Sequence, residues 1–260
     1  MSEDPYASIA DIYDFSYADF TEDIEFYENL ARAVDGPILE LGVGSGRVAF
    51  PLAEAGYEVV GIDTSPSMLD RAQRRLAAAK LKKGRLELVA ADMTGFDLGR
   101  RFGLILIAAD TFQHLLTTKE QRACIECVAR HLAPGGLFVL SVRSPASVEW
   151  ESGGTPSPLL LDWTRRDADS GALILKFVAA EADPARMTRR LTYIYDRIHS
   201  GSVQRTVFQT ELRYSTQAEI EMLLQDAALH VTHLYGDYDL SPVGYGADNL
   251  IFVARAEGKT

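Results

Sequence analysis

The stretch that decides the fold is PILELGVGSGRVAFPLAEAGYEVVGIDTSPSML, residues 37–69. An apolar run leads into three glycines, Gly42, Gly44 and Gly46, and a second apolar run ends at Asp63. Glycine has no Cβ, so a turn built from it lets a ligand approach the backbone closely. The stretch therefore predicts a ligand site that combines a strand-to-helix glycine turn with a carboxylate at the end of the next strand.

Strands and helices continue to alternate on both sides of this stretch. We predict helices over residues 19–34, 45–56, 65–80 and 118–136, and strands over 36–42, 57–63, 85–93, 102–110 and 137–143. Ser65 is expected to cap the third of these helices, with Pro66 at its first position. The strand at 102–110 is continuously apolar, which is typical of a strand buried on both faces. This order predicts an α/β fold with a doubly wound, mostly parallel sheet.

The pattern changes after Arg143. Four segments with partial alternation of polar and apolar residues, at 158–167, 171–182, 187–200 and 202–215, are separated by turn residues and predict an antiparallel β meander. A helix over 215–229 and strands over 230–236 and 249–256 then complete a seven-stranded sheet. We therefore divide the chain into a core at 1–144, an antiparallel insertion at 145–213 after the fifth strand, and a return to the core at 214–260.

Composition narrows the function. The 260 residues carry a formal net charge of -11, whereas a nucleic-acid surface needs clustered Lys and Arg. The first residues lack a basic start followed by an apolar stretch, and no apolar run reaches the length of about 18 residues that suggests a membrane span. We expect a cytoplasmic protein with neither nucleic acid nor membrane as partner. Cys124 and Cys127 fall in a helical pattern without a second pair, so buried thiols are expected and no metal.

The glycine spacing separates two kinds of ligand. A dinucleotide site uses G-x-G-x-x-G, with the pyrophosphate on the helix N-terminus. Here the spacing is G-x-G-x-G, and Arg47 stands where the last glycine of the dinucleotide pattern would be. A nicotinamide-dependent oxidoreductase is therefore the disfavoured alternative.

Four segments together carry a more specific resemblance: LELGVGSGR (residues 39–47), VVGIDTS (59–65), AADM (90–93) and LAPGG (132–136). They resemble the motifs of class I S-adenosylmethionine-dependent methyltransferases, whose element order agrees with nearly the whole chain. The N-terminal YASIADIYDFSYADF, the DTFQHL segment at 110–115 and the insertion resemble small-molecule methyltransferases, including those that N-methylate amino sugars. The resemblance implies S-adenosylmethionine as cofactor and methyl transfer as activity.

The resemblance also implies which residues bind this cofactor. Glu40 would lie near the methionyl ammonium, Asp63 would accept hydrogen bonds from the ribose hydroxyls, and Met68 would cover the adenine face. Asp92 and the Met93 backbone N–H would read the adenine edge. The other expected cofactor residues are Tyr13, Gly42, Gly44, Gly46, Arg47, Thr64, Ala108 and Asp110. The alternatives are a bare glycine turn, a helix-start role for Asp63, a core position for Met68 and a turn cap at Asp92.

His114 is the catalytic candidate. It follows the fourth strand, its ordinary pKa of about 6.5 suits proton acceptance near neutrality, and the related sugar N-methyltransferases have a His in the corresponding loop. An amine acceptor needs little help, whereas a hydroxyl needs a general base. The alternative is a histidine that only packs or bonds a helix start.

The N-terminal tyrosines Tyr6, Tyr13 and Tyr17 are expected to form a lid. In similar enzymes this segment closes over the cofactor, and Tyr13 is our candidate to reach the cofactor carboxylate. The acceptor pocket is expected to draw on the lid, the fifth-strand end, the insertion and the loop before the last strand, through Tyr17, Arg143, Trp150, Tyr195, Arg197 and Tyr245. For each of these the alternative is a place in the core or on the sheet surface.

The sequence thus predicts methyl transfer to a small-molecule acceptor, with an amine nitrogen preferred. A nucleic-acid acceptor is disfavoured, because the fourth strand is followed by Asp110-Thr111-Phe112-Gln113 and not by an N/D-P-P-Y/F motif. Two alternatives stay open: an O-methyltransferase of a small hydroxylated metabolite, and a catalytically silent protein that binds S-adenosylmethionine or acts as a scaffold. The insertion is further expected to support a homodimer.

Overall fold

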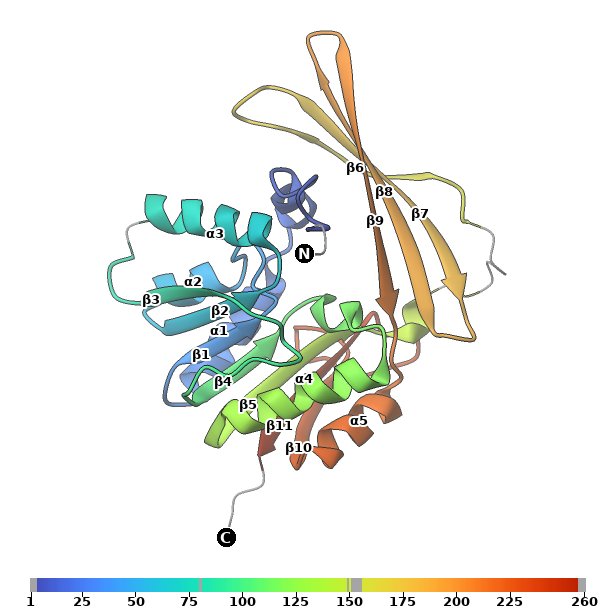
Figure 1. Ribbon diagram of the computed structural model, residues 1–260. Helices are drawn as coiled ribbons and strands as arrows, with labels where there is room; N and C mark the ends of the chain where they lie inside the picture. Colours follow the sequence, from blue (N-terminus) through green and yellow to red (C-terminus); the bar gives the residue numbers. More distant parts are fainter. Residues whose placement is uncertain (1–3, 80, 149, 151–155, 257–260) are drawn as a thin grey trace.

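The computed structural model describes residues 4–79, 81–148, 150 and 156–256. Its framework is a seven-stranded sheet in the order β10-β11-β5-β4-β1-β2-β3 (Figure 1). The strands of this sheet are β1 (Ile38–Leu41), β2 (Glu58–Asp63), β3 (Arg85–Ala90), β4 (Phe102–Ile107), β5 (Leu132–Arg143), β10 (Leu229–Tyr235) and β11 (Asn249–Ala256). The first five pair in parallel, while β11 pairs antiparallel with β5 and β10. The predicted fold class is confirmed.

Helices cover both faces of this sheet. They are α1 (Glu22–Arg32), α2 (Ala49–Glu54), α3 (Pro66–Ala78), α4 (Thr118–His131) and α5 (Gln217–Asp226). Strand β4 shows why both faces need cover: Ile105 and Ile107 join the core beneath α4 and α5, whereas Leu104 and Leu106 join the core beneath α1 and α2. As its continuous apolar run predicted, every residue of β4 is buried.

Local signals set the helix ends. Ser65 caps α3, its Oγ accepting from the Met68 N–H at 3.2 Å, as predicted; residue 80, the predicted end of this helix, lies outside the described residues. Helix α2 begins later than the predicted residue 45, because Gly46 has a φ of 84° that no α-helix contains. The predicted helix 118–136 ends at His131, and β5 starts at once, because Pro134 has no N–H for the helix to use.

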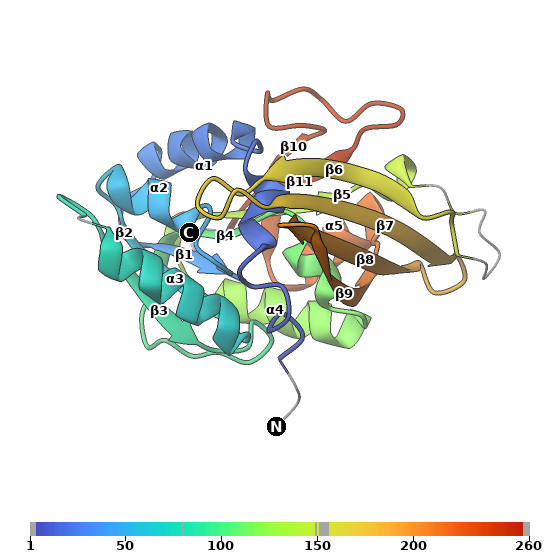
Figure 2. The ribbon, with the colours of Figure 1, turned by 90° about the horizontal axis from the view of Figure 1, so that it is seen from above.

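The insertion forms a second sheet, a meander of four antiparallel strands: β6 (Leu160–Arg166), β7 (Leu173–Asp183), β8 (Thr188–His199) and β9 (Ser202–Arg213). It rises beyond the carboxyl ends of the parallel strands, and the N-terminal segment lies between it and α3 (Figures 1 and 2). Ile9 and Ile12 pack against Ile174, Tyr195 and Phe208 of its inner face. No helix in the described part of the chain is long and apolar enough to cross a membrane.

Candidate active site

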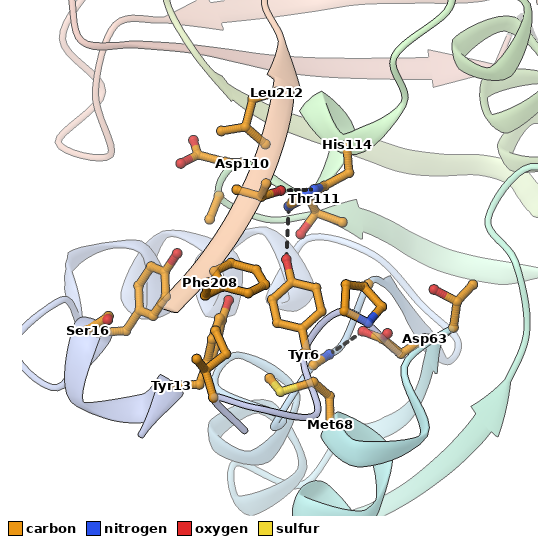
Figure 3. A pocket seen from close by; sticks show the side chains of 18 of the residues that line it. Tyr6, Tyr13, Ser16, Asp63, Met68, Asp110, Thr111, His114, Phe208 and Leu212 are labelled. Carbon is orange, nitrogen blue, oxygen red and sulfur yellow. Dashed lines mark hydrogen bonds between the residues drawn. The ribbon is translucent and has the colours of Figure 1, made fainter. Parts of the chain in front are cut away.

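The main pocket lies where these three parts meet. Its floor is formed by the carboxyl ends of β1, β2 and β4, and its other walls by the N-terminal segment and the inner face of β7, β8 and β9 (Figure 3). The cavity measures about 260 Å³. Ligands of open α/β sheets bind outside the carboxyl ends of the strands, so the pocket occupies the place that the fold favours for a ligand site.

The glycine turn after β1 brings backbone to the pocket wall. Gly42 and Gly44 line the pocket, and both have positive φ, 71° and 53°. A Cβ on Gly42 would lie 2.2 Å from Cγ2 of Thr111, so a side chain does not fit. Gly46 differs, because a Cβ there would meet the Phe50 ring at 2.6 Å. The third predicted glycine thus lets α2 pack closely and does not line the pocket.

Asp63 ends β2 directly beside this turn. Its Oδ2 accepts from the Gly44 N–H and its Oδ1 from the Ser65 N–H, each at 2.8 Å. Each carboxylate oxygen has two lone pairs, so one on each oxygen is left after these bonds. Asp63 therefore has a turn-stabilising role and also, with its neighbour Thr64, lines the pocket. Burial raises the pKa of Asp63.

An apolar wall stands next to Asp63. It is formed by Met68 from α3 with Ile62, Ala91 and Met93. Met68 is buried, so it is a core residue and a pocket residue at once. Asp92 turns away: it is exposed, and its Oδ1 accepts from the N–H and Oγ1 of Thr94, both at 2.8 Å. Its side chain caps the turn after β3, and Asp92 is not among the pocket-lining residues.

A buried charge cluster lies behind the glycine turn. Arg47 forms a two-pronged ion pair with the fully buried Asp23, at 2.7 and 2.6 Å, which commits its guanidinium there and not to the pocket. Glu40 is 3% exposed and its Oε2 has no hydrogen-bond partner. Burial raises the pKa of Glu40 to about 8, against the opposing effect of Arg47. The carboxyl groups of Asp23 and Glu40 thus share the single positive charge of Arg47. Because Asp23 forms the ion pair with Arg47, a further cation near Glu40 would favour the ionised form of Glu40.

The other end of the pocket is formed by the segment after β4. Ala108, the first residue of this segment, is buried, and Ala109 adopts an unusual positive φ of 51°. Asp110 and Thr111 line the pocket. The short helix η2 (Thr111–His114) then presents His114. Burial lowers the pKa of His114, and Asp110 acts in the opposite direction.

Both ring nitrogens of His114 have partners. Nε2 lies 3.1 Å from the hydroxyl of Tyr6 in the N-terminal segment, and Nδ1 lies 3.4 Å from Oγ1 of Thr210 on β9 (Figure 3). The imidazole therefore links all three walls of the pocket. Neither partner belongs to the short helix that carries His114.

Comparison with known proteins identifies the family. Residues 38–136 match a family model described as a methyltransferase domain. Cypemycin N-terminal methyltransferase from a Streptomyces species is 28% identical over 230 residues, which cover 87% of this chain and 86% of that protein. The dTDP-3-amino-3,4,6-trideoxy-alpha-D-glucopyranose N,N-dimethyltransferase of Streptomyces venezuelae is 29% identical over 138 residues, 50% of this chain and 55% of that protein. The solved CcbJ methyltransferase of Streptomyces caelestis is 29% identical and superposes with a TM-score of 0.80, covering 98% of this chain and 99% of that one.

The chain is an S-adenosylmethionine-dependent methyltransferase. The resemblance inferred from its glycine turn and strand ends is confirmed, including the likeness to small-molecule enzymes, and so is the cofactor. The residues of the pocket fit this cofactor. Backbone at Gly42 and Gly44 is open to it, the free lone pairs of Asp63 suit two ribose hydroxyls, and the wall at Met68 suits adenine.

Part of the pocket wall of this methyltransferase was predicted and part was missed. Tyr17 and Tyr195, predicted for the acceptor, and Tyr13, predicted for the cofactor, all line the pocket. Tyr6 was expected only as one of the lid tyrosines, and it lines the pocket as well. The inward-facing residues of the insertion were missed: Lys176, Tyr193, Phe208, Thr210 and Leu212. Alternation in β9 places residues 208, 210 and 212 on one face, so this signal groups three of them but does not tell which face lines the pocket.

Two predicted acceptor residues of the methyltransferase lie just behind the wall. Arg143, at the end of β5, has its Nε 3.8 Å from Oδ1 of Asp110. Trp150 packs edge-on against Tyr214, with ring centroids 5.4 Å apart, and its Nε1 donates to the Pro145 carbonyl. Neither is among the pocket-lining residues: Arg143 reaches the pocket only through its partner Asp110, and the partners of Trp150 lie outside the cavity.

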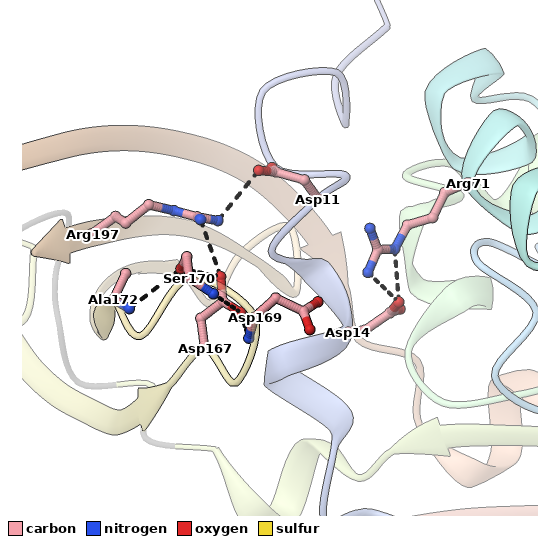
Figure 4. A network of polar contacts seen from close by, with 8 residues as sticks. All are labelled: Asp11, Asp14, Arg71, Asp167, Asp169, Ser170, Ala172 and Arg197. Atoms are coloured by element: carbon pink, nitrogen blue, oxygen red, sulfur yellow. Dashed lines mark hydrogen bonds and ion pairs between the residues drawn. The ribbon is translucent and has the colours of Figure 1, made fainter. Parts of the chain in front are cut away.

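The other two lie farther out. Tyr245 is fully exposed in the loop between β10 and β11. Arg197 of β8 points to the N-terminal segment and forms ion pairs with Asp11 at 3.4 Å and Asp167 at 3.3 Å (Figure 4). Arg197 therefore binds the N-terminal segment and does not line the pocket.

Ion pairs fasten the N-terminal segment of the methyltransferase on two sides. Towards the sheet domain, Asp14 accepts from Nε of Arg71 on α3 at 2.7 Å (Figure 4). Towards the insertion, Asp11 meets Arg197, and Asp19 lies 2.8 Å from Arg165. The segment thereby covers the pocket, which a lid that excludes water has to do.

Proposed function

We propose that this methyltransferase transfers the methyl group to the amine nitrogen of a small molecule. The observation that carries the proposal is the character of the acceptor end of the pocket. The Asp110 carboxylate and the rings of Tyr13 and Phe208 line it, and both carboxylates and aromatic faces attract a cationic amine.

Lys176 lines the pocket too, but its ammonium is paired with Asp162 at 2.9 Å and lies over the Tyr193 ring. The one histidine in the described pocket lining, His114, is half-buried, and desolvation lowers its pKa, which makes it a weaker base than a free imidazole.

These features suit an amine better than a hydroxyl. An α-amino group has a pKa of about 8, so roughly one-tenth of it is neutral and nucleophilic at pH 7. A hydroxyl releases its proton only to a general base placed against it, and such a base works best with a pKa near the working pH. Lowering the pKa of His114 moves it away from that optimum.

Bound S-adenosylmethionine supplies a methyl group on a sulfonium leaving group. The chain therefore has to align the acceptor, and alignment can supply much of the rate. Gly44 and Asp63 would hold the cofactor at one end of the pocket, Tyr6 and His114 would hold the acceptor at the other, and the N-terminal segment would keep water out. The acceptors named for two relatives, a peptide N-terminus and an amino sugar, are both amines.

The test is a paired acceptor screen. The protein is incubated with methyl-labelled S-adenosylmethionine and with pairs of amines and alcohols of the same skeleton, including amino sugars and short peptides, and products are identified by mass spectrometry. Methylation of an amine but not of its paired alcohol supports the proposal. Transfer to the alcohol supports O-methylation, and cofactor binding without any transfer supports the silent binding protein.

We also propose that the insertion pairs with a second copy of the chain. Cross-strand partners share a face of a sheet, and the register aligns Leu161, Phe177, Ile194 and Val207 in one row across all four strands. This row lies on the face opposite Phe208, and Leu161 and Val207 are exposed at 54% and 53%. The nearby ions on this face are already paired, Glu181 with Arg190 and Asp196 with Arg205. An identical apolar face with neutralised charges is therefore a suitable partner.

A further inference from the structure

We infer that His114 acts through Tyr6: it orients the Tyr6 hydroxyl, whose oxygen accepts a hydrogen bond from an N–H of the acceptor and thereby aims the nitrogen lone pair. The inference rests on the proposed amine acceptor. It makes Tyr6 a catalytic residue, because Tyr6 touches the substrate, and makes His114 a positioning residue.

The first step is the contact between the two side chains. The Tyr6 hydroxyl and His114 Nε2 are 3.1 Å apart, although the residues come from opposite walls of the pocket (Figure 3). The Tyr6 ring is held on its sides by Phe208, at a centroid distance of 5.2 Å, and by Tyr13, at 5.9 Å. Its hydroxyl therefore has a fixed position at the pocket surface.

The second step is the direction of the hydrogen bonds. Thr210 Oγ1 lies 3.4 Å from His114 Nδ1. A neutral imidazole has one N–H donor and one acceptor nitrogen. If Nδ1–H donates to Thr210, Nε2 accepts from the Tyr6 O–H. The Tyr6 oxygen then has no proton left for the pocket and offers only its lone pairs, so a ligand group that meets it has to be a donor.

The third step concerns charge. The charged neighbour of His114 is Asp110. The titratable neighbours that influence the Tyr6 hydroxyl electrostatically are Tyr17, Asp63, Asp110 and Tyr195. Burial lowers the pKa of His114, while Asp110 raises it; burial and all four neighbours raise the pKa of Tyr6. Both side chains are therefore neutral near pH 7. A proton is not transferred through this pair, and the acceptor amine loses its proton to solvent before it reacts.

A substrate rule follows from the lone pairs of Tyr6. A primary or secondary amine in its neutral form still has an N–H to donate while its lone pair points at the methyl group. A tertiary amine has none. We therefore expect monomethylation and dimethylation, and no formation of a quaternary ammonium.

The arrangement can be tested without any acceptor. In ¹⁵N NMR of the histidine rings, the His114 signals are assigned by their loss in His114→Asn. We expect a neutral ring with the proton on Nδ1 at pH 7 to 8, and a shift of the Nε2 signal in Tyr6→Phe. A His114 ring that titrates near pH 6.5 and is indifferent to Tyr6→Phe overturns the inference, whatever the acceptor proves to be.

Turnover supplies the second test. Tyr6→Phe and His114→Asn should each lower kcat about tenfold to a hundredfold, as misalignment does, and the double variant should be no worse than the worse single one. The affinity for S-adenosylmethionine and the melting temperature report that each variant is folded. Tyr235→Phe is the matched control, since Tyr235 stacks on His233 at 5.8 Å outside the pocket, and it should leave kcat unchanged.

The pH profile separates positioning from base catalysis. With a series of amines, the pH at which kcat/KM falls on the acid side should follow the pKa of the amine and should persist in His114→Asn. An inflection that stays constant across the series and disappears in His114→Asn would make His114 a base and overturn the inference. Quaternary products from a tertiary amine would overturn it as well. A wild type that methylates only alcohols contradicts the proposed function, while the NMR result still decides the role of His114.

Discussion

The two halves of the pocket are built in different ways. The half that we propose for the cofactor, called the cofactor half, consists of backbone and short side chains that follow β1 and β2, with Gly44 and Asp63 joined by a hydrogen bond of 2.8 Å. The half that we propose for the acceptor, called the acceptor half, consists of large side chains from segments far apart in the sequence, such as Tyr6, His114 and Phe208. One half is fixed by neighbours along the chain and in the sheet, and the other exists only when three parts of the fold come together.

This difference explains where the cofactor and acceptor functions separate. A cofactor common to many enzymes can be bound by a turn that a short motif specifies. An acceptor has to be recognised by surfaces that vary, and loops and insertions on a rigid scaffold are where such variation is tolerated. Variants in the two halves should therefore separate cofactor affinity from acceptor affinity.

Asp63→Ala should have the largest effect and should fall on the cofactor half. Loss of two hydrogen bonds between ribose hydroxyls and a carboxylate, at about 1.5 kcal/mol or more each, weakens binding of S-adenosylmethionine roughly a hundredfold or more. Titration calorimetry measures it. Asp92→Ala is the matched control, because Asp92 follows the neighbouring strand β3 but bonds Thr94. An equal loss in the control would contradict the placement of the cofactor.

The outer face of the insertion provides the next test, because it contrasts with the inner face. Val207→Glu places a charge in the apolar row, and burial of an unpaired charge is costly. We expect a dimer of the wild type to dissociate into monomers, observed by sedimentation or light scattering. Gln204→Glu, with an exposed side chain on the opposite face of the same strand, should leave the mass unchanged. A wild type that is monomeric at all concentrations contradicts the proposal.

Phe208→Ala should affect the acceptor half alone. The ring packs against Tyr6 and lies stacked on Tyr193 at a centroid distance of 6.1 Å, so its loss leaves the acceptor loosely held. Truncation of a buried Phe also costs about 3 kcal/mol or more of stability; assays are therefore run well below the melting temperature. We expect KM for the acceptor to rise about tenfold and the affinity for S-adenosylmethionine to stay within twofold. A larger loss of cofactor affinity than of acceptor affinity would mean that the halves are not separate.

The same contrast decides what could be predicted from the sequence. Gly42, Gly44, Asp63 and Met68 were placed correctly in the pocket, because strand ends and turn residues are local signals. Arg197 and Trp150 were expected to line the pocket and do not. Arg197 contacts Asp11 and Trp150 contacts Tyr214, and such contacts are fixed by tertiary packing, which the sequence pattern does not show. Lys176 and Tyr193 were missed because alternation shows which residues share a face and not which face is covered.

Glu40 should give the smallest effect and the most specific one. Its pKa, raised by burial to about 8 from an ordinary 4.5, means that the folded protein binds a proton at Glu40 that the unfolded chain releases. The stability contributed by Glu40 is therefore present below pH 4.5 and is lost as the pH rises towards 8. Glu40→Gln should remove this loss, so that melting temperatures of the variant fall less between pH 5 and 8 than those of the wild type.

Cofactor binding reverses the sign at the same residue. A methionyl ammonium near Glu40 favours the ionised carboxylate, so S-adenosylmethionine should release up to about one proton on binding at pH 7. Calorimetry in buffers of different ionisation enthalpy measures the number, and Glu40→Gln should abolish it. Binding without proton release in the wild type would show that Glu40 keeps its proton and serves only Arg47 and the core. Proton release by the wild type but not by Glu40→Gln would show that the buried charge cluster responds to cofactor bound in the pocket, although Glu40 itself does not line the pocket.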